Sequence, residues 1–357
     1  MRILITGNMG YVGPAVTAQL REHHPGAELI GYDTGLFASA LTTTGPAPET
    51  RLDAQRFGDV RDITAADLVG CDAVVHLAAI SNDPIGNRFA AITDAINRAA
   101  SLRLADCARQ AGVGHFVFAS SCSVYGLADS GARRESDATG PLTAYARSKV
   151  ATEDGLRQRA DERMTVTCLR FATACGFSER LRLDLVLNDF VACALTSGKI
   201  TVLSDGTPWR PLIDVADMAR AIDWACFRAP ENGGRMLVVN AGADARNHQV
   251  RDLAHAVAAA VPGAAVSINT AAPHDSRSYR VDFALFRALA PDHQPRVDLA
   301  ASIAGLVAGL RGIGFADAEF RHSPRLIRLN TVAALMERGA LSPDLRWAWR
   351  GAAAAAE

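Results

Sequence analysis

Short apolar runs alternate with longer amphipathic segments along the first half of this 357-residue chain. Runs rich in β-branched residues predict buried strands, whereas apolar residues at intervals of about three or four predict helices. Helices are expected from about residue 11, over 87–111 and around residue 145. The predicted strands are RILIT (2–6), AELIGY (27–32), AVVHL (73–77), HFVFA (115–119) and MTVTCLRF (164–171). This alternation predicts an α/β fold, a doubly wound parallel sheet.

The alternation changes after Gly176, which indicates a second unit. Residues 1–176, completed by part of 213–240, are expected to form the sheet domain. Residues 177–345 are expected to form a smaller α/β C-terminal lobe, and residues 346–357 a tail. The elements predicted beyond Gly176 are helices at 185–196, from 214 and at 247–263, a short strand pair within 199–213, and a strand MLVVN at 236–240.

Composition and charge exclude several classes of protein. The formal net charge is -1 and there is no run of Lys or Arg, so nucleic acid is not an expected partner. No segment reaches the roughly 18 consecutive apolar residues of a membrane span, and the amino-terminal apolar run is too short for a signal peptide. The seven cysteines are scattered without a C-x-x-C pair, which argues against disulfides and zinc. A cytoplasmic protein is expected.

A glycine-rich loop follows the first predicted strand. Gly7, Gly10 and Gly13 stand at G-x-x-G-x-x-G spacing before a predicted helix. Gly7 would allow a tight turn, Gly10 would let a pyrophosphate approach closely, and the helix N-terminus would offer N–H groups to it. Asp33 ends the second strand 20 residues after Gly13, where a carboxylate accepts hydrogen bonds from ribose hydroxyls and repels a 2′-phosphate. The pattern predicts a Rossmann domain that binds NAD in preference to NADP.

Two further segments fit the same cofactor site. The residues HLAA (76–79) end the fourth strand in small side chains, which would let the backbone approach a cofactor. Asp59 follows the third strand, where an adenine would lie, but it could equally cap the next helix. His76 is interpreted as a packed strand residue, because no partner lies at metal-ligand spacing.

Tyr145 and Lys149 are four residues apart on a predicted helix, so both side chains project from one face. A tyrosine is a poor base at neutral pH, but a nearby ammonium group favours the phenolate and lowers its pKa. Such a tyrosine can take a proton from a sugar hydroxyl as hydride leaves the same carbon. Cys122 has no neighbouring base or cation in the sequence and is read as a packed thiol.

The chain resembles the extended short-chain dehydrogenase/reductase family, the NAD-dependent nucleotide-sugar epimerases and dehydratases. The resemblance implies an NAD-binding Rossmann domain at 1–176, a substrate-binding lobe at 177–345, a nucleotide-sugar substrate and a homodimer formed through the helices from 87 and 143. The resemblance rests on the motifs TGNMGYVG, Asp33, GDV, HLAA, NRAAS, SSCSVYG, YARSK, NDFV, SDGTPWRPLIDVADMARAI and DSRSYRV.

The resemblance also implies roles for individual residues. Ser121 would hydrogen-bond the reacting sugar oxygen, Tyr145 would be the acid/base, and Lys149 would activate it and contact the ribose. Arg277 could instead form a surface ion pair. The cofactor residues would be Gly7, Gly10, Tyr11, Val12, Gly13, Asp33, Asp59, Val60, Leu77, Ala78, Ala79, Asn97, Tyr145 and Lys149. The substrate residues would be Ser81, Ser121, Ser123, Thr173, Asn188, Arg210 and Arg277, and no metal is expected.

Two departures from the family pattern bear on which reaction the chain catalyses. Dehydratases of 4,6-position sugars carry Asp and Glu directly after the catalytic hydroxyl, where this chain has Cys122 and Ser123. Without those acids, removal of a 6-hydroxyl lacks its general acid and base. Thr173 stands where the family often has Asn, which leaves the sugar orientation open. The expected function is an NAD-dependent nucleotide-sugar epimerase, acting at C4 through a 4-keto intermediate.

Two alternatives remain open from the sequence. An NAD-dependent 4-ketosugar reductase or sugar dehydrogenase of the same fold could use the same serine, tyrosine and lysine. A non-catalytic NAD-binding sensor is a third reading, but such proteins typically lose the tyrosine or the lysine, and this chain keeps both.

Overall fold

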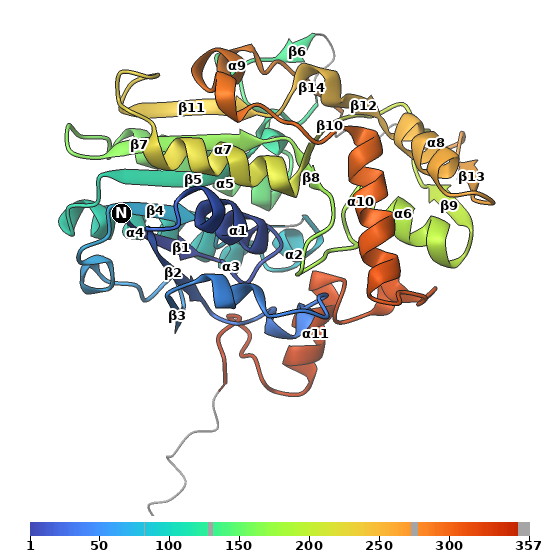
Figure 1. The fold of residues 1–357 in the computed structure, drawn as a ribbon, viewed down its shortest axis with the longest axis horizontal. Helices are drawn as coiled ribbons and strands as arrows, with labels where there is room; N and C mark the ends of the chain where they lie inside the picture. The colour runs from blue at the N-terminus through green and yellow to red at the C-terminus, as the bar shows by residue number, and fades with distance from the viewer. Residues whose placement is uncertain (82, 128–130, 273–277, 349–357) are drawn as a thin grey trace, which may run out of the picture.

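A seven-stranded parallel sheet organises the computed structural model, which describes residues 1–81, 83–127, 131–272 and 278–348. The strand order is β11-β7-β5-β4-β1-β2-β3, so the chain starts near the centre and winds toward both edges (Figure 1). All six pairings are parallel. The strands are β1 (Arg2–Thr6), β2 (Glu28–Asp33), β3 (Ala54–Phe57), β4 (Ala73–His76), β5 (His115–Ser121), β7 (Thr165–Phe171) and β11 (Met236–Ala241). The predicted α/β doubly wound fold is confirmed.

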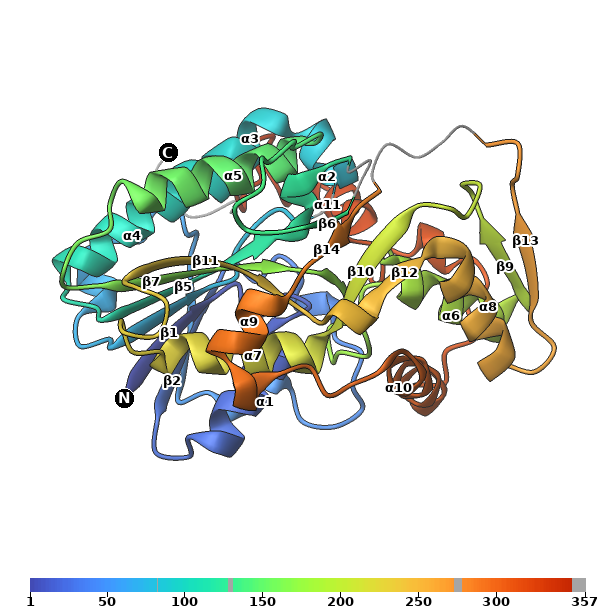
Figure 2. The ribbon, with the colours of Figure 1, turned by 90° about the horizontal axis from the view of Figure 1, so that it is seen from above.

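Helices cover both faces of the sheet. Figure 2 shows α1 (Gly13–His23) and α7 (Val215–Phe227) on one face, and α4 (Ser101–Gln110) and α5 (Ala144–Arg157) on the other. Asp214 caps α7 by accepting a hydrogen bond from the Ala216 N–H, at 3.0 Å. None of the helices in the described parts of the chain has both the length and the apolar surface that crossing a bilayer demands. The homodimer expected through α4 and α5 stays a prediction.

The helix predicted over 87–111 is not continuous. It is divided into α2 (Asp83–Arg88), α3 (Ala90–Asp94), a π-helical segment at Ala95–Ala100, and α4. Phe89 breaks the first two with a non-helical backbone, φ -124° and ψ 50°. In the π-helical segment the Asn97 carbonyl accepts hydrogen bonds from the Ser101 and Thr152 hydroxyls, at 2.6 and 3.0 Å. These contacts tie the segment to α5, and single π-helical turns of this kind are frequent at functional sites.

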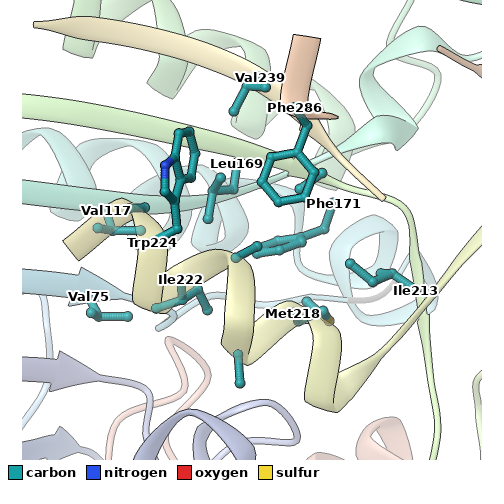
Figure 3. Packing of buried hydrophobic residues seen from close by; sticks show 14 of the residues in the cluster. Val75, Val117, Leu169, Phe171, Ile213, Met218, Ile222, Trp224, Val239 and Phe286 are labelled. Carbon is teal, nitrogen blue, oxygen red and sulfur yellow. The ribbon is translucent and has the colours of Figure 1, made fainter. Parts of the chain in front are cut away.

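The core between the sheet and α7 includes a helix from late in the chain. Figure 3 shows strand residues such as Leu169 and Val239 packed against Ile222 and Trp224 of α7. Phe286 of α9 (Ala284–Leu289) completes this cluster and meets the Trp224 ring edge-on, with centroids 5.6 Å apart. Residues far apart in sequence therefore share one core, and α9 packs on the sheet domain.

The second lobe is built from α6 (Val186–Thr196), α8 (Val250–Ala260) and α10 (Leu299–Gly312), which share a core of their own. The strand pair predicted within 199–213 is wrong. Both strands form, but β9 (Lys199–Val202) pairs with β13 (Ala265–Ile268), and β10 (Trp209–Asp214) pairs with β8 (Thr173–Cys175) and β12 (Asn247–Gln249). The first three residues of the helix predicted from 247 thus belong to β12, where they pair with β10.

Residues 328–347 return to the sheet domain, and we call them the C-terminal strap. The strap contains α11 (Arg328–Glu337), which Figure 2 shows beside α2. Val332 and Leu335 pack with Ile85 of α2 and with Leu341 and Leu345. Beyond that cluster, the Trp347 indole N–H donates to the Thr34 carbonyl at 2.7 Å, and Arg346 pairs with Asp62. Positions 346 and 347, expected in the tail, are therefore anchored to the loops after β2 and β3.

Replacing Phe286 with alanine is expected to lower the free energy of unfolding by about 3–5 kcal/mol, because a fully buried ring leaves a cavity. Leu203→Ala is the matched control, since this side chain is 79% exposed and should change stability by about 0.5 kcal/mol or less. Urea unfolding followed by circular dichroism measures both. Equal effects of the two substitutions would contradict the packing of α9 on the sheet.

Candidate functional site

A cavity of about 880 Å³ lies at the carboxyl ends of the strands and extends to the second lobe. Ligands of open parallel sheets bind at this end of the strands. The structure brings most of the predicted site residues to the cavity wall. Arg277 lies outside the described residues. The predicted residues that line the cavity are Gly7, Gly10, Tyr11, Val12, Asp33, Asp59, Val60, Leu77, Ala78, Ala79, Ser81, Ser121, Ser123, Tyr145, Lys149, Thr173 and Arg210.

The glycine loop needs its glycines for two different reasons. Gly7 has φ +74°, and a Cβ atom there would lie 2.5 Å from the backbone nitrogen of Ala78. Gly7 therefore permits both the turn and the close approach of the loop after β4. Gly13 is not among the residues that line the cavity, and its contact with the cofactor stays a prediction. Its Cβ would lie 1.9 Å from the Asn8 carbonyl oxygen, so glycine is required for packing α1 against the loop.

Asp33 presents a carboxylate at the end of β2. It accepts hydrogen bonds from the Gly35 N–H at 2.8 Å and the Met9 N–H at 3.1 Å, one on each oxygen. Each oxygen keeps a further lone pair for a ligand hydroxyl. Burial raises the pKa of the Asp33 carboxyl above its usual range, and the two backbone N–H groups oppose that rise.

Asp59 also lines the cavity, but its carboxylate is already engaged. It pairs with Arg61 at 2.6 Å and accepts the Arg61 backbone N–H at 2.8 Å. The second contact spans two residues, the pattern of an aspartate that stabilises a turn. Of the two readings, the structure thus favours the local structural one, at the wall of the cavity.

Asn97 was predicted to line the cofactor pocket, and this stays a prediction. Its side chain is buried and absent from the cavity wall. The amide nitrogen donates to the Ile80 carbonyl at 2.9 Å and to the Ser148 hydroxyl at 3.1 Å, and the amide oxygen accepts from the Ile80 N–H at 2.8 Å. Asn97 thus holds the loop after β4, whose residues face the cavity.

Asn188 was predicted to hold a diphosphate, and it too lies behind the wall. It is completely buried on α6. Its amide oxygen accepts from the Gly176 N–H at 3.1 Å, and its amide nitrogen donates to the Arg182 carbonyl at 2.9 Å and the Tyr11 hydroxyl at 3.2 Å. These bonds join the lobe to the glycine loop, so the residue positions cavity residues from both.

The serines after β5 have different surroundings. Ser121 lines the cavity, and its hydroxyl accepts the Ser123 N–H at 3.2 Å. The Ser123 hydroxyl also lies at the cavity and has no hydrogen-bond partner among the described residues. Ser120 also contributes to the cavity wall, but its hydroxyl donates to the buried Glu153 carboxylate. Cys122 is 0% exposed and donates to the Arg170 carbonyl at 3.1 Å, and burial raises the pKa of its thiol.

Tyr145 and Lys149 stand together on α5, as the spacing predicts. The helix is capped by Thr143, whose hydroxyl accepts the Ala146 N–H at 3.1 Å. The Lys149 ammonium nitrogen lies 5.5 Å from the centre of the Tyr145 ring and donates to the Ala119 carbonyl at 2.6 Å. Burial lowers the pKa of Lys149 to about 8. At neutral pH a cation therefore lies beside the phenol, the arrangement that favours phenolate.

A buried network stands behind Lys149. Arg170 of β7 and Glu153, one helical turn after Lys149, form a two-pronged ion pair with contacts of 3.0 and 2.6 Å. Arg170 also donates to the Tyr125 hydroxyl at 3.0 Å. The Glu153 charge opposes the effect of burial on the Lys149 pKa. The network fixes α5 against β5 and β7 and helps to keep Lys149 protonated.

His76 is a packed residue, as expected. Its ring nitrogens lie 2.7 Å from the hydroxyls of Thr6 and Ser101, and burial lowers its pKa to about 3. Across the described ranges, no group of three or more His, Cys, Asp or Glu side chains is placed to hold a metal ion.

Several charged cavity residues were missed by the sequence reading. Arg182 pairs with Asp184 at 2.9 Å and donates to the Ser81 hydroxyl at 2.9 Å. Arg321 pairs with Asp189 at 2.8 Å, and Arg328 of α11 also lines the cavity. The alternation of charged residues with leucines in ERLRLDL (179–185) was the available signal, because charged side chains in a buried segment often serve a site.

Comparison with known proteins shows which proteins this chain resembles. The model of the NAD dependent epimerase/dehydratase family matches residues 3–242. A UDP-glucose 4-epimerase of Corynebacterium glutamicum is 28% identical over 239 residues, 62% of this chain and 69% of that protein. A dTDP-glucose 4,6-dehydratase of Streptomyces griseus is 27% identical over 321 residues, 86% of this chain and 93% of that protein.

Solved structures give the same outline. The structure of an NAD-dependent NDP-hexosamine 5,6-dehydratase involved in tunicamycin biosynthesis superposes with a TM-score of 0.75 at 25% identity. The match covers 89% of this chain and 99% of that one. Epimerases and dehydratases thus share this architecture, and the reaction has to be argued from the side chains of the cavity.

Ser120→Ala is expected to lower the free energy of unfolding by about 1–3 kcal/mol, because the buried Glu153 carboxylate loses a donor. Ser121→Ala removes only the acceptor for one N–H and should cost about 1 kcal/mol or less. Urea unfolding of the two variants compares the adjacent serines directly. A larger loss for Ser121→Ala would contradict the assignment of Ser120 to the buried network.

Proposed function

Because the chain belongs to the NAD-dependent epimerase/dehydratase family, we propose that it is a nucleotide-sugar epimerase that inverts C4 through a 4-keto intermediate. One observation carries this proposal. Ser121, Tyr145 and Lys149 share a cavity with Asp33 and the glycine loop, while the two positions after Ser121 supply no acid. The cavity thus combines a dinucleotide site with an acid/base pair, and Cys122 and Ser123 stand at the positions where dehydratases carry their acids.

The residues present fit NAD. Asp33 has free lone pairs for ribose hydroxyls, and Gly7 lets the backbones of β1 and β4 approach where a diphosphate would lie. The first N–H groups of α1, which begins at Gly13, have no acceptors within the helix and suit the phosphate charge. When bound, NAD accepts a hydride from a sugar carbon and can return it.

Side chains of the cavity would remove and return the proton of the sugar 4-hydroxyl. Tyr145, as phenolate beside the Lys149 ammonium, would take the proton of the 4-hydroxyl, and the Ser121 hydroxyl would hydrogen-bond the same oxygen. The keto sugar would then rotate so that the opposite face of C4 is presented for the return of hydride. The Tyr145 phenol would give the proton back to the sugar oxygen at that stage. Lys149 thus stabilises the charge that forms on Tyr145, and Ser121 keeps the reacting oxygen within reach of it.

The residues after Ser121 argue against loss of water. Cys122 is fully buried and directs its thiol to the Arg170 carbonyl, behind the wall. Ser123 reaches the cavity, but a hydroxyl neither holds nor releases a proton readily at neutral pH. A dehydratase needs a general acid for the leaving hydroxyl, and neither residue supplies one. This supports reversible oxidation without elimination as the reaction.

The lobe end of the cavity is suited to the nucleotide diphosphate. Arg210 of β10 lines it, and the fork of a guanidinium matches phosphate oxygens. Thr173 and Ser81 lie on the same wall and could hydrogen-bond the sugar. The solved structure of a related protein, 26% identical and with a TM-score of 0.73, holds UDP-glucuronic acid and NAD, which supports a nucleotide sugar as the substrate class.

Incubation with UDP-, dTDP-, GDP- and CDP-sugars, followed by NMR of the products, tests the proposal. One pair of 4-epimers should interconvert without net formation of NADH. Tyr145→Phe should lower kcat about 10²- to 10⁴-fold, the usual contribution of a general acid/base. Tyr125→Phe is the matched control, because its hydroxyl lies outside the cavity, where it bonds to Asn240 and to Arg170 of the network behind Lys149.

The control alters only the network behind Lys149, so it should lose far less kcat than Tyr145→Phe. For the same reason Ser121→Ala should lose more activity than Ser120→Ala, whose hydroxyl bonds to Glu153. Stoichiometric consumption of NAD or NADH without an isomer would instead indicate a net reductase or dehydrogenase. A product that has lost water would overturn the argument from Cys122 and Ser123.

The activity should fall above a pH of about 8, where Lys149 loses its proton. Below that pH the ammonium stabilises the Tyr145 phenolate; above it the stabilisation disappears and the tyrosine becomes a poorer base. Lys149→Arg should move the fall to higher pH, because a guanidinium stays charged. Profiles of kcat/KM for both proteins measure the shift, and an unchanged upper limb would contradict the role of Lys149.

A further inference from the structure

A cationic side chain of the C-terminal strap lines the cavity without a role in the function proposed above. Arg328 is the first residue of α11 and is 3% exposed. Its guanidinium stacks on the Phe37 ring, with the central carbon 4.7 Å from the ring centre, and both residues form part of the cavity wall. The stacking fixes the plane of the guanidinium and hence the direction of its N–H groups.

Arg328 differs from its neighbours in having no counter-ion. In the part of the chain that the structure describes, no carboxylate lies at ion-pair distance from it. Its two hydrogen bonds go to the carbonyls of Arg180 and Arg325, at 2.9 and 3.4 Å, and further N–H donors remain. By contrast, the buried arginines Arg180 and Arg182 are paired with Glu49 and Asp184.

A buried cation without a partner is unfavourable. Burial lowers the pKa of Arg328 to about 9, and the side chain is still protonated at neutral pH. The free energy that its burial costs is recovered only when an anion arrives. The cavity therefore holds a positive charge positioned for an anionic ligand.

The position of Arg328 indicates which anion. The Phe37 ring on which it stacks belongs to the loop after Asp33. The Arg180 carbonyl to which it donates follows Ser178, whose hydroxyl donates to the Tyr11 carbonyl of the glycine loop at 2.6 Å. Arg328 is thus attached to segments that contact the glycine loop, and the anion of a dinucleotide expected at that loop is the diphosphate.

We propose that Arg328 binds the diphosphate of NAD, so that the C-terminal strap completes the cofactor site. This rests on the proposed use of NAD. The strap lies outside the region matched by the family model, residues 3–242, so this contact is not part of that shared region. The cluster around Val332 and the anchors at Arg346 and Trp347 hold the strap across the loops after β2, β3 and β4.

Titration of purified protein with NAD, ADP and adenosine tests the proposal. Calorimetry suits NAD and ADP, and ligand-observed NMR suits the weaker adenosine complex. Arg328→Met should lower the affinity for NAD and for ADP roughly 10- to 100-fold, as expected for the loss of hydrogen bonds to a charged group. The affinity for adenosine should change less than about twofold. The affinity of Arg328→Lys for NAD and ADP should lie between those of wild type and Arg328→Met, because an ammonium group keeps the charge but lacks the planar fork of a guanidinium.

Arg325→Met is the matched control. Arg325 is an exposed arginine three residues away that bonds to the Leu41 carbonyl and does not line the cavity. It should leave all three affinities within about twofold of wild type. Urea unfolding shows whether each variant is folded, and if Arg328→Met fails to fold, the selective loss is measured on Arg328→Lys.

The outcomes separate this proposal from the proposed function. Equal losses for adenosine, ADP and NAD would show that Arg328 only supports the strap and would overturn the inference, as would unchanged affinity for ADP. Wild-type protein that binds NAD through Arg328 but does not interconvert sugars would overturn the epimerase and leave the inference standing. Wild-type protein that does not bind NAD would overturn both.

Discussion

The parallel direction of all seven strands is the constraint on which the site depends. Because every strand points the same way, every carboxyl end reaches one edge of the sheet, and each crossover returns through a helix. The close approach of Gly7 to Ala78 is the tightest consequence, since it brings the exits of β1 and β4 together. Residues separated by more than a hundred positions, such as Asp33 and Tyr145, thereby line one cavity.

The buried charges around the cavity are of two kinds, ion pairs and single cations. The Glu153–Arg170 pair is almost fully buried, and it fixes α5 while adding a negative charge near Lys149. A lysine buried alone would lose its proton more readily, so the pair behind the wall supports the acid/base chemistry in front of it. Arg328 shows the opposite arrangement, a cation whose counter-ion is left to the ligand.

The sequence allowed prediction of those site residues whose positions depend on the end of a strand or on the spacing along a helix. Asp33, Ser121 and the pair Tyr145 and Lys149 reach the cavity because each follows directly from an element that the apolar pattern reveals. The hydrogen bonds by which Asn97 and Asn188 hold loops, and the packing that requires Gly13, could not be predicted, because they depend on segments distant in sequence. Arg328 could not be predicted, since no local pattern reveals where a distant helix returns.

An epimerase of the proposed kind makes a specific demand on its cofactor site. The sugar is oxidised and reduced within one turnover, so the cofactor must remain bound while the keto sugar turns. The apolar cluster of the strap and the Trp347 bond to Thr34 cover the loops that carry Asp33 and Asp59. A cofactor beneath such a cover leaves only when these contacts open, and an ionic bond to the strap would add to that barrier. A net dehydrogenase needs the reverse, because it must exchange its cofactor in every cycle. An anchored strap therefore supports a cofactor that is retained through the turnover, as the proposed epimerase requires and a net dehydrogenase does not.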